Sequence, residues 1–155
     1  MTFSIIRPLR AGDLDRVGHL VEANDLFPAD MLSGMTAPFL AGDTTTHRWL
    51  VLERAGVDAV AYYVPEQLTE GTWNLLLIAV DPSAHGQGVG TALVRAVESD
   101  LADSGQRLLL IETSGTDRFA ATRAFYEKRG FTFEARIRDY YAAGDDKIIY
   151  RKALG

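Results

Sequence analysis

The chain has 155 residues, 47% of them hydrophobic and 24% charged, a composition that excludes a disordered protein and leaves room for one hydrophobic core. Its formal net charge of -5 argues against a nucleic acid or an anionic membrane surface as a partner. It has no cysteine and only three scattered histidines, which excludes a disulfide framework and a metal site built from thiolates or clustered histidines.

Residues 1–155 are expected to form a single domain, because this length is typical of one folded unit. Met1 to Arg10 contains no long apolar stretch, and nowhere do about eighteen apolar residues run together. We therefore expect neither a secretion signal nor a membrane span, and a cytoplasmic protein.

The N-terminal third is predicted to combine short strands with helices. Residues 3–7 favour a strand, and apolar residues at helical spacing over 14–21 predict a helix capped by Asp13. Residues 28–40 favour a short or interrupted helix, because a glycine and a proline break their apolar spacing. Two β-branched or aromatic runs predict a hairpin around Ala55-Gly56. These runs are Trp49 to Glu53 and Val57 to Val64.

The centre of the chain predicts a strand, a helix and a second strand. Leu75 to Val80 is an unbroken apolar run, typical of a strand covered on both faces. Apolar residues recur every four positions from Val89 to Leu101, which predicts a helix that Ser104-Gly105 ends. Leu108 to Ile111 is a second apolar run, so Trp73 to Glu112 should form a right-handed parallel crossover with a ligand crevice at its strand ends.

The next helix is predicted from Asp117 to Arg129, with Gly130 ending it in the left-handed conformation. Phe131 would then fold back onto Phe125 and turn Phe125 into the core. The adjacent Tyr126 would point away from the core, since neighbouring helical residues lie about a quarter-turn or more apart.

The C-terminal residues predict a second hairpin. Apolar and polar residues alternate from Phe131 to Ile137, which favours a half-buried strand, and Lys147 to Lys152 resembles its partner.

The segment from His85 to Thr91 joins the central strand to the amphipathic helix and contains three glycines at alternate positions. Glycines let the backbone approach a ligand and turn its N–H groups toward one point, and a helix start favours negative charge, so the segment could hold a diphosphate. A tight strand-to-helix turn is the alternative. The dinucleotide fingerprint is excluded because Thr91 stands where it needs glycine, and the Lys-Ser or Lys-Thr of nucleotide triphosphatases is absent.

Two motifs in the correct order resemble the GNAT family of N-acetyltransferases. His85, Gly88 and Gly90 occupy the places of the family's coenzyme A signature, although His85 replaces the usual Arg or Gln. Ala124 to Phe131 is close to the family's FYEKxGF pattern on the following helix. The resemblance covers nearly the whole chain. It implies a mixed α/β fold, with a mostly antiparallel sheet that opens at a central, splayed parallel strand pair flanked by helices.

The resemblance also implies acetyl-coenzyme A as the co-substrate and no metal. The family's central strand splays near a bulge, where its backbone hydrogen-bonds the pantetheine arm as an added strand would. An Asn common in the family is replaced by Phe119, which removes one expected coenzyme contact. The residues that the resemblance assigns to coenzyme binding are Ile78, Ala79, Val80, His85, Gly86, Gln87, Gly88, Val89, Gly90 and Thr91.

Tyr126 resembles the family tyrosine that gives a proton to the departing thiolate. A phenol with a pKa near 10 is neutral at pH 7 and can donate a hydrogen bond to charge developing on sulfur. The alternative is that Tyr126 only packs its helix.

A general base is also needed, because alkylammonium groups must lose a proton before attack. Glu112, at the end of the second parallel strand, is the leading candidate, with Glu66 and Glu70 as alternatives. A carboxylate in such a position is more often a solvated surface charge, which is the other interpretation of each. Asp139-Tyr140-Tyr141 and Asp145-Asp146 lie around the last hairpin, which tends to border the acceptor site in the family. Acids and aromatic rings suit a cationic amine, or they form a polar turn.

We therefore expect an enzyme that acetylates a primary amine, on a small molecule or a peptide, by direct attack. The alternatives are transfer of another acyl group, a non-catalytic sensor of coenzyme A, and a nucleotide-binding module, which the failed loop patterns disfavour. The resemblance leaves a homodimer open, and the sequence does not name the acceptor.

Overall fold

The computed structural model describes residues 3–155. Over these residues the chain forms seven strands, four α-helices and short 3₁₀ turns. The strands are β1 (Ile5–Pro8), β2 (Arg48–Glu53), β3 (Val57–Pro65), β4 (Thr72–Val80), β5 (Leu108–Ser114), β6 (Thr132–Ala142) and β7 (Asp145–Ala153). The helices are α1 (Leu14–Ala23), α2 (Leu32–Leu40), α3 (Val89–Asp103) and α4 (Ala120–Lys128).

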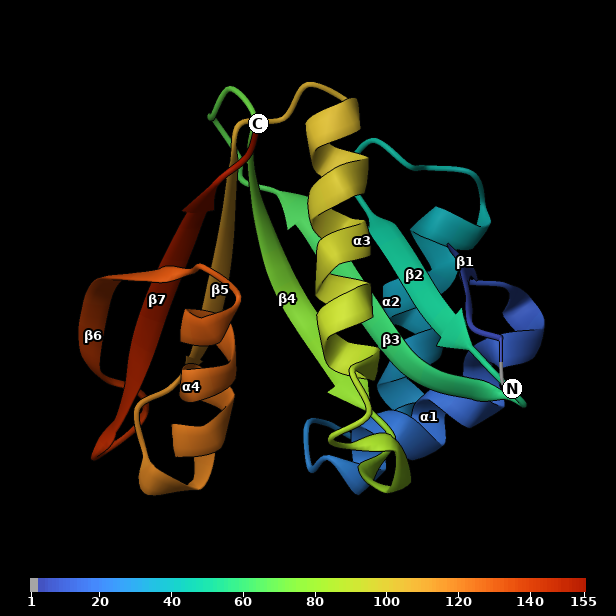
Figure 1. The fold of residues 1–155 in the computed structure, drawn as a ribbon, viewed down its shortest axis with the longest axis horizontal. Coiled ribbons are helices and arrows are strands. Elements are labelled where there is room, and N and C mark those ends of the chain that lie inside the picture. Colours follow the sequence, from blue (N-terminus) through green and yellow to red (C-terminus); the bar gives the residue numbers. More distant parts are fainter. Residues whose placement is uncertain (1–2) are drawn as a thin grey trace.

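All seven strands belong to one sheet in the order β1-β2-β3-β4-β5-β7-β6. Every neighbouring pair is antiparallel except β4 and β5, which are parallel as the crossover predicts. Their pairing extends only from Thr72–Leu108 to Leu75–Ile111. A bulge at Leu76 follows in β4, and the two strands then separate toward their carboxyl ends (Figure 1). The mixed, mostly antiparallel sheet with a splayed parallel pair is confirmed.

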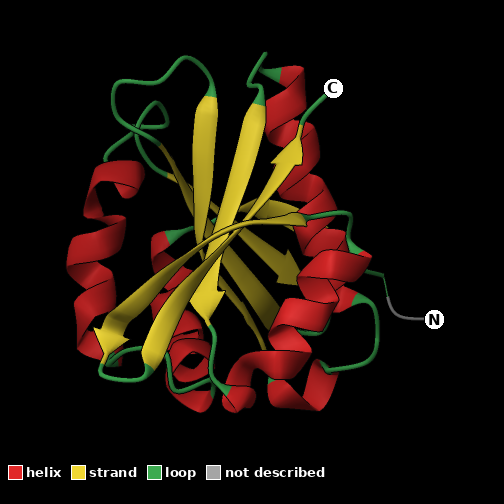
Figure 2. Ribbon diagram, turned by 90° about the vertical axis from the view of Figure 1, so that its left-hand side faces the viewer, coloured by secondary structure: helices red, strands yellow, loops and turns green. Residues whose placement is uncertain are grey.

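Helices cover both faces of the sheet, with α3 and α4 on one face and α1 and α2 on the other (Figures 1 and 2). The apolar stripe of α3, which includes Leu93, Val97 and Leu101, packs in one buried cluster with Trp73 and Leu75 of β4 and the inward residues of β5 and β7. A second cluster joins α1 and α2 to the opposite face of β2, β3 and β4. The sheet is thus buried on both faces at its centre, in agreement with the apolar run of β4.

The sheet ends at β6, and this strand differs from its prediction. The alternation predicts a half-buried strand, which is wrong: Phe133 is 56% exposed and Ile137 is 43% exposed. The reason is position, because β6 is hydrogen-bonded only to β7 at the edge of the sheet. Its pairing is irregular between Ile137 and Ala142, where three extra residues bulge out of the ladder.

Among residues 3–155, no helix combines the length and the apolar composition needed to cross a membrane.

The start of α1 is fixed to β1 by a buried ion pair. Arg7 donates from both Nη atoms to the two carboxylate oxygens of Asp13, at 2.8 and 2.9 Å, and the two side chains are 11% and 10% exposed. The backbone N–H of Arg10 donates to the same carboxylate. Asp13 does directly precede α1, but its carboxylate faces Arg7 and makes no capping bond to the helix. The hydrogen bond from Arg7 lowers the pKa of Asp13 from its ordinary 3.8.

Asp13→Asn should lower the free energy of unfolding by roughly 1 to 3 kcal/mol at pH 7, because it leaves Arg7 with only its longer pair to the more exposed Glu53, at 3.3 Å. Since the folded-state pKa of Asp13 is depressed, its stabilisation is complete above pH 3.8 and is lost as the pH falls through the folded-state value. Urea unfolding at pH 7 and at successively lower pH checks this. A difference between the two proteins that stays constant below pH 3.8 would contradict it.

Candidate functional site

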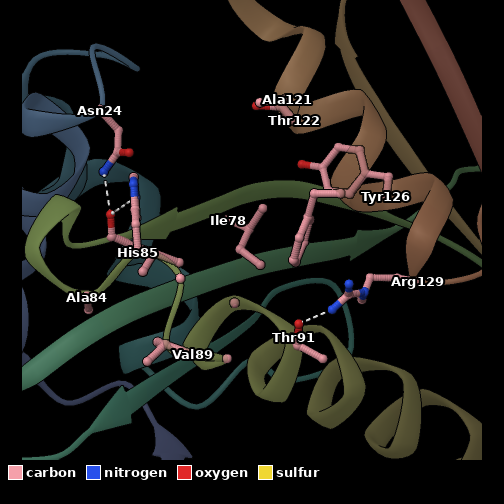
Figure 3. A pocket seen from close by; sticks show the side chains of 15 residues that line it. Asn24, Ile78, Ala84, His85, Val89, Thr91, Ala121, Thr122, Tyr126 and Arg129 are labelled. Carbon is pink, nitrogen blue, oxygen red and sulfur yellow. Dashed lines mark hydrogen bonds between the residues drawn. The ribbon is translucent and has the colours of Figure 1, made fainter.

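A cavity of about 490 Å³ lies on the α3–α4 face, where β4 has separated from β5. The end of β4, the loop that follows it, the first turn of α3 and one side of α4 form its walls (Figure 3). The lining residues are Asn24, Ile78, Val80, Ala84, His85, Gly86, Gly88, Val89, Gly90, Thr91, Ala121, Thr122, Phe125, Tyr126 and Arg129.

The loop before α3 has the backbone conformation of an anion cradle. Gly86 and Gly88 have φ values of 77° and 76°, in the left-handed region that favours glycine, and Gly88 is the residue immediately before α3. Gly90 is favoured for a different reason, because a Cβ there would lie 3.3 Å from Cζ of Phe125, and the ring would have to move by a few tenths of an ångström. The first backbone N–H groups of a fifteen-residue helix therefore border open space, which suits a phosphate group.

His85 binds the protein's own backbone. Its Nε2 lies 3.1 Å from the carbonyl oxygen of Val80, which also accepts a hydrogen bond of 3.0 Å from Nδ2 of Asn24 at the end of α1. Figure 3 shows both bonds meeting at one oxygen. Asn24 was not predicted from the sequence, because nothing in α1 indicates a contact with β4.

The predicted coenzyme residues fall into two groups. Eight of the ten line the cavity, and two do not. Ala79 is buried in the core on the opposite face of the sheet. The side chain of Gln87 turns outward, where it accepts a bond of 2.7 Å from Arg54 and donates to the carbonyl oxygen of Ser83.

The end of α4 corrects one prediction. Gly130 ends the helix with a φ of 93°, as predicted, and the N–H of Phe131 donates to the carbonyl oxygen of Tyr126 at 3.1 Å. Such a reversal brings Phe131 over the residue five positions earlier, which is Tyr126. The contact of Phe131 with Phe125 and the outward direction of Tyr126 were therefore wrong. Tyr126 is 5% exposed in the core, and Phe125 is half-buried and lines the cavity.

Tyr126 is held by aromatic side chains on three sides. Its ring makes edge contacts with Phe125, Phe131 and Tyr150, with centroids 5.8 to 6.2 Å apart. Figure 3 shows the ring reaching from α4 into the cavity with its hydroxyl group at the tip. Burial, with a smaller contribution from nearby Tyr141, raises the pKa of this phenol above its usual value of 10. Tyr126 is therefore protonated at neutral pH and can donate a hydrogen bond.

Arg129 adds a cation to the cavity that was not predicted. Its guanidinium donates to the hydroxyl of Thr91 in the first turn of α3 and lies 4.8 Å from the ring centre of Phe125. Within residues 3–155 it has no carboxylate at ion-pair distance, unlike Arg7, Arg48 and Arg54. The available signal was its spacing, because Arg129 follows Phe125 by four residues and so lies on the same side of the helix.

Glu112 lies outside this cavity, on the opposite face of the sheet. It is the first residue of β5 beyond the last partner of β4, so it stands where the strands begin to separate. Its Oε2 is 2.8 Å from Nζ of Lys147, and its Oε1 accepts a hydrogen bond of 3.0 Å from Asn74. Asn74 also donates to Glu66, whereas Glu70 is exposed. Two of the three candidate bases are thus joined through one amide.

The polar residues of the last hairpin contact one another or the rest of the chain. Asp146 holds Arg136 and the N–H of Asp139, and Asp145 accepts a hydrogen bond from Ser114. The ring of Tyr140 lies 4.0 Å from Nζ of Lys147. In the described part of the chain, no group of three His, Asp or Glu side chains could hold a metal ion.

Comparison with known proteins identifies the family. Residues 45–133 match the family model of the acetyltransferase (GNAT) domain. A Desulfovibrio desulfuricans structure assigned to the GNAT family is 35% identical, with a TM-score of 0.89 over 100% of both chains. An uncharacterized N-acetyltransferase of Methanocaldococcus jannaschii is 24% identical over 96% of this chain and 90% of its own. A Salmonella typhimurium structure assigned as an acetyltransferase, solved with acetyl-CoA, is 18% identical, with a TM-score of 0.76 over 98% and 94% of the two chains. With the signature loop and the tyrosine-bearing helix on one cavity, these matches show that the chain belongs to the GNAT family of acetyltransferases.

Proposed function

We propose that this chain, acting as one domain, transfers an acetyl group from acetyl-CoA to a primary amine by direct attack. The observation that carries the proposal is the position of two features on one cavity at the opening of the sheet. A cradle of backbone N–H groups lies at one wall, and the neutral phenol of Tyr126 lies at the other. A binding protein would need only the first of these features.

The coenzyme fits the cavity by its chemistry. The backbone from Gly86 to Gly90 would hold the diphosphate, and Arg129 would add a charge-assisted hydrogen bond to a phosphate oxygen. The backbone of Ile78 to Val80 has no β5 partner, so it can pair with the amides of the pantetheine arm as with an added strand. The carbonyl of Val80 already accepts two bonds, so we expect the arm to use the groups before it.

The chemistry needs a base for the amine and an acid for the leaving thiolate. Glu112 is the proposed base: it takes a proton from the acceptor's ammonium, and the free amine then attacks the thioester carbonyl. A carbon–nitrogen bond forms, the carbon–sulfur bond breaks, and Tyr126 protonates the departing sulfur. The nitrogen then releases its second proton, which restores the Tyr126 phenol through solvent. Because the two residues lie on opposite faces of the sheet, the acceptor would enter from the Glu112 side and meet the acetyl group in the gap between β4 and β5.

The acceptor is proposed to be an amine on a small molecule or a peptide. The last hairpin does not favour a strongly cationic acceptor, because Lys147 already lies over the Tyr140 ring, and Arg136 and a backbone N–H group already bind Asp146. Beside the opening, Leu76 is 50% exposed and Tyr141 is 47% exposed, so they offer apolar and aromatic surface to the group that carries the amine.

Calorimetric titration should give binding of coenzyme A and no binding of ATP. Thiol release from acetyl-CoA across a panel of amines and peptides then identifies the acceptor class. Coenzyme A binding without thiol release on any acceptor would favour a non-catalytic sensor, and faster release from longer acyl-CoA esters would favour another acyl group. Binding of ATP alone would contradict the family's function and return the glycine loop to a structural turn.

Tyr126→Phe should bind acetyl-CoA with unchanged affinity and turn over about 100-fold more slowly, because it keeps the ring and removes the proton donor. Tyr150→Phe is the matched control, since Tyr150 packs against Tyr126 while its hydroxyl donates to Glu127. Steady-state kinetics and calorimetry check both variants. Equal turnover in Tyr126→Phe and the native protein would leave the phenol with a packing role only.

Arg129→Gln should weaken coenzyme A binding roughly tenfold, because one charge-assisted hydrogen bond to phosphate is lost. Lys128→Gln removes the same charge from the neighbouring position, which is exposed and does not line the cavity. Calorimetry of both variants separates a local contact from a general loss of positive charge. Equal weakening in the two variants would contradict a specific contact by Arg129.

A further inference from the structure

The sheet face opposite α3 and α4 carries a continuous row of polar side chains from the end of β3 to β6. Nδ2 of Asn74 donates to Oε1 of Glu66 at 2.9 Å and to Oε1 of Glu112 at 3.0 Å. The other oxygen of Glu112 meets Nζ of Lys147 at 2.8 Å, and that ammonium lies 4.0 Å from the ring centre of Tyr140. Both oxygens of the proposed base are therefore held from opposite sides.

Lys147 is unusually well buried for a lysine. It is 8% exposed, and lysine is almost never buried to this degree unless it is paired. Burial alone lowers the pKa of its ammonium, but the interactions with Glu112 and Tyr140 outweigh burial and raise the pKa above the ordinary 10.5. Lys147 is therefore a cation throughout the pH range of an enzyme assay, and Glu112 is its counter-charge.

The Glu112–Lys147 pair lies at the point where β4 and β5 separate. Glu112 is the first residue past the last β4–β5 pair, and Asn74 belongs to the last stretch of β4 that is still paired. Asn74 is 2% exposed, so its amide is a fixed donor. Lys147 approaches from β7, which is antiparallel to β5 and has Ile149 directly opposite Glu112. The carboxylate is thus aimed by one group on each neighbouring strand.

We propose that Lys147 is a positioning residue for the acetyl transfer, which holds the Glu112 carboxylate in a fixed direction beside the opening. The inference rests on the proposed role of Glu112 as the base. The ammonium holds one carboxylate oxygen at 2.8 Å, and the Asn74 amide holds the other at 3.0 Å, so the group cannot turn without losing a contact. Without Lys147, the carboxylate would keep only the Asn74 amide, which it shares with Glu66, and could turn away from the opening.

Other titratable groups face the pair as well. Glu66 approaches from the β3–β4 loop through Asn74, and Tyr140 and Tyr141 approach from β6. Asp145 lies on β7 and is bonded to Ser114. Burial raises the pKa of Tyr141 above 10, so this phenol stays neutral in the assay range. Glu66 shares the Asn74 amide with Glu112, so Lys147 is the partner that Glu112 does not share with another carboxylate.

The test is the steady-state kinetics of Lys147→Met, measured with the acceptor identified by thiol release. We expect kcat to fall about tenfold or more, because the carboxylate loses its direction, while the KM for acetyl-CoA stays within about twofold of the native value, because the coenzyme cavity lies on the other face of the sheet. Lys147→Arg, which keeps a cation that can pair with the carboxylate, should recover most of the lost kcat. Lys128→Met is the control, because Lys128 is exposed and does not line the cavity. An unchanged kcat in Lys147→Met, or a Lys147→Arg variant as slow as Lys147→Met, overturns the proposal.

A second measurement does not depend on turnover. The titration of the Lys147 amine, followed by NMR of its Nζ, should move to lower pH by about one unit or more in Glu112→Gln, because coupling between two titrating groups is reciprocal. If no amine is acetylated, the proposed function fails, and this shift still decides whether the two groups are coupled. An unchanged Lys147 titration in Glu112→Gln rules the coupling out, and the positioning role with it.

Discussion

The short pairing of β4 with β5 is the constraint on which the rest of the structure depends. These strands share a ladder only as far as Leu75 and Ile111, and the bulge at Leu76 directs the rest of β4 away. Two consequences follow from one interrupted ladder. Unpaired backbone of β4 borders the cavity on the α3–α4 face, and Glu112 lies at the same gap on the other face. If β4 and β5 were paired along their whole length, the sheet would separate the cavity from Glu112 completely.

Two left-handed glycines orient the helices that border the gap. Gly88 turns the chain into α3, so that the start of this helix faces the cavity, and Gly130 reverses the chain after α4. The second reversal places Phe131 on Tyr126, and this contact fixes the phenol between the core and the cavity. Backbone conformation thus determines the positions of both the anion cradle and the proton donor, before any side-chain chemistry is considered.

Local patterns predicted most of the elements, because apolar periodicity and turn residues act over a few positions. The parallel crossover and the glycine loop were predictable in this way, and the two motifs indicated the family. The direction of Tyr126 was not, since it depends on which residue the reversal at Gly130 covers. Arg129 and Lys147 were also missed as site residues. Their partners Thr91 and Glu112 are distant in sequence, and no local pattern reports a contact that only the folded sheet creates.

The long edge strand β6 bears on how copies of this chain behave toward one another. Its outer backbone groups are unpaired, and such an edge can nucleate strand addition between molecules and thereby aggregation. Glu134, Arg136 and Arg138 put charges along it, and Asp139, with a φ of 54°, interrupts its straight path. A strand of another molecule that added to this edge would have to bury these charges and pair with an irregular ladder. Both steps cost free energy. The irregular stretch of β6 between Ile137 and Ala142 therefore also disfavours fibril-like association between copies of the chain.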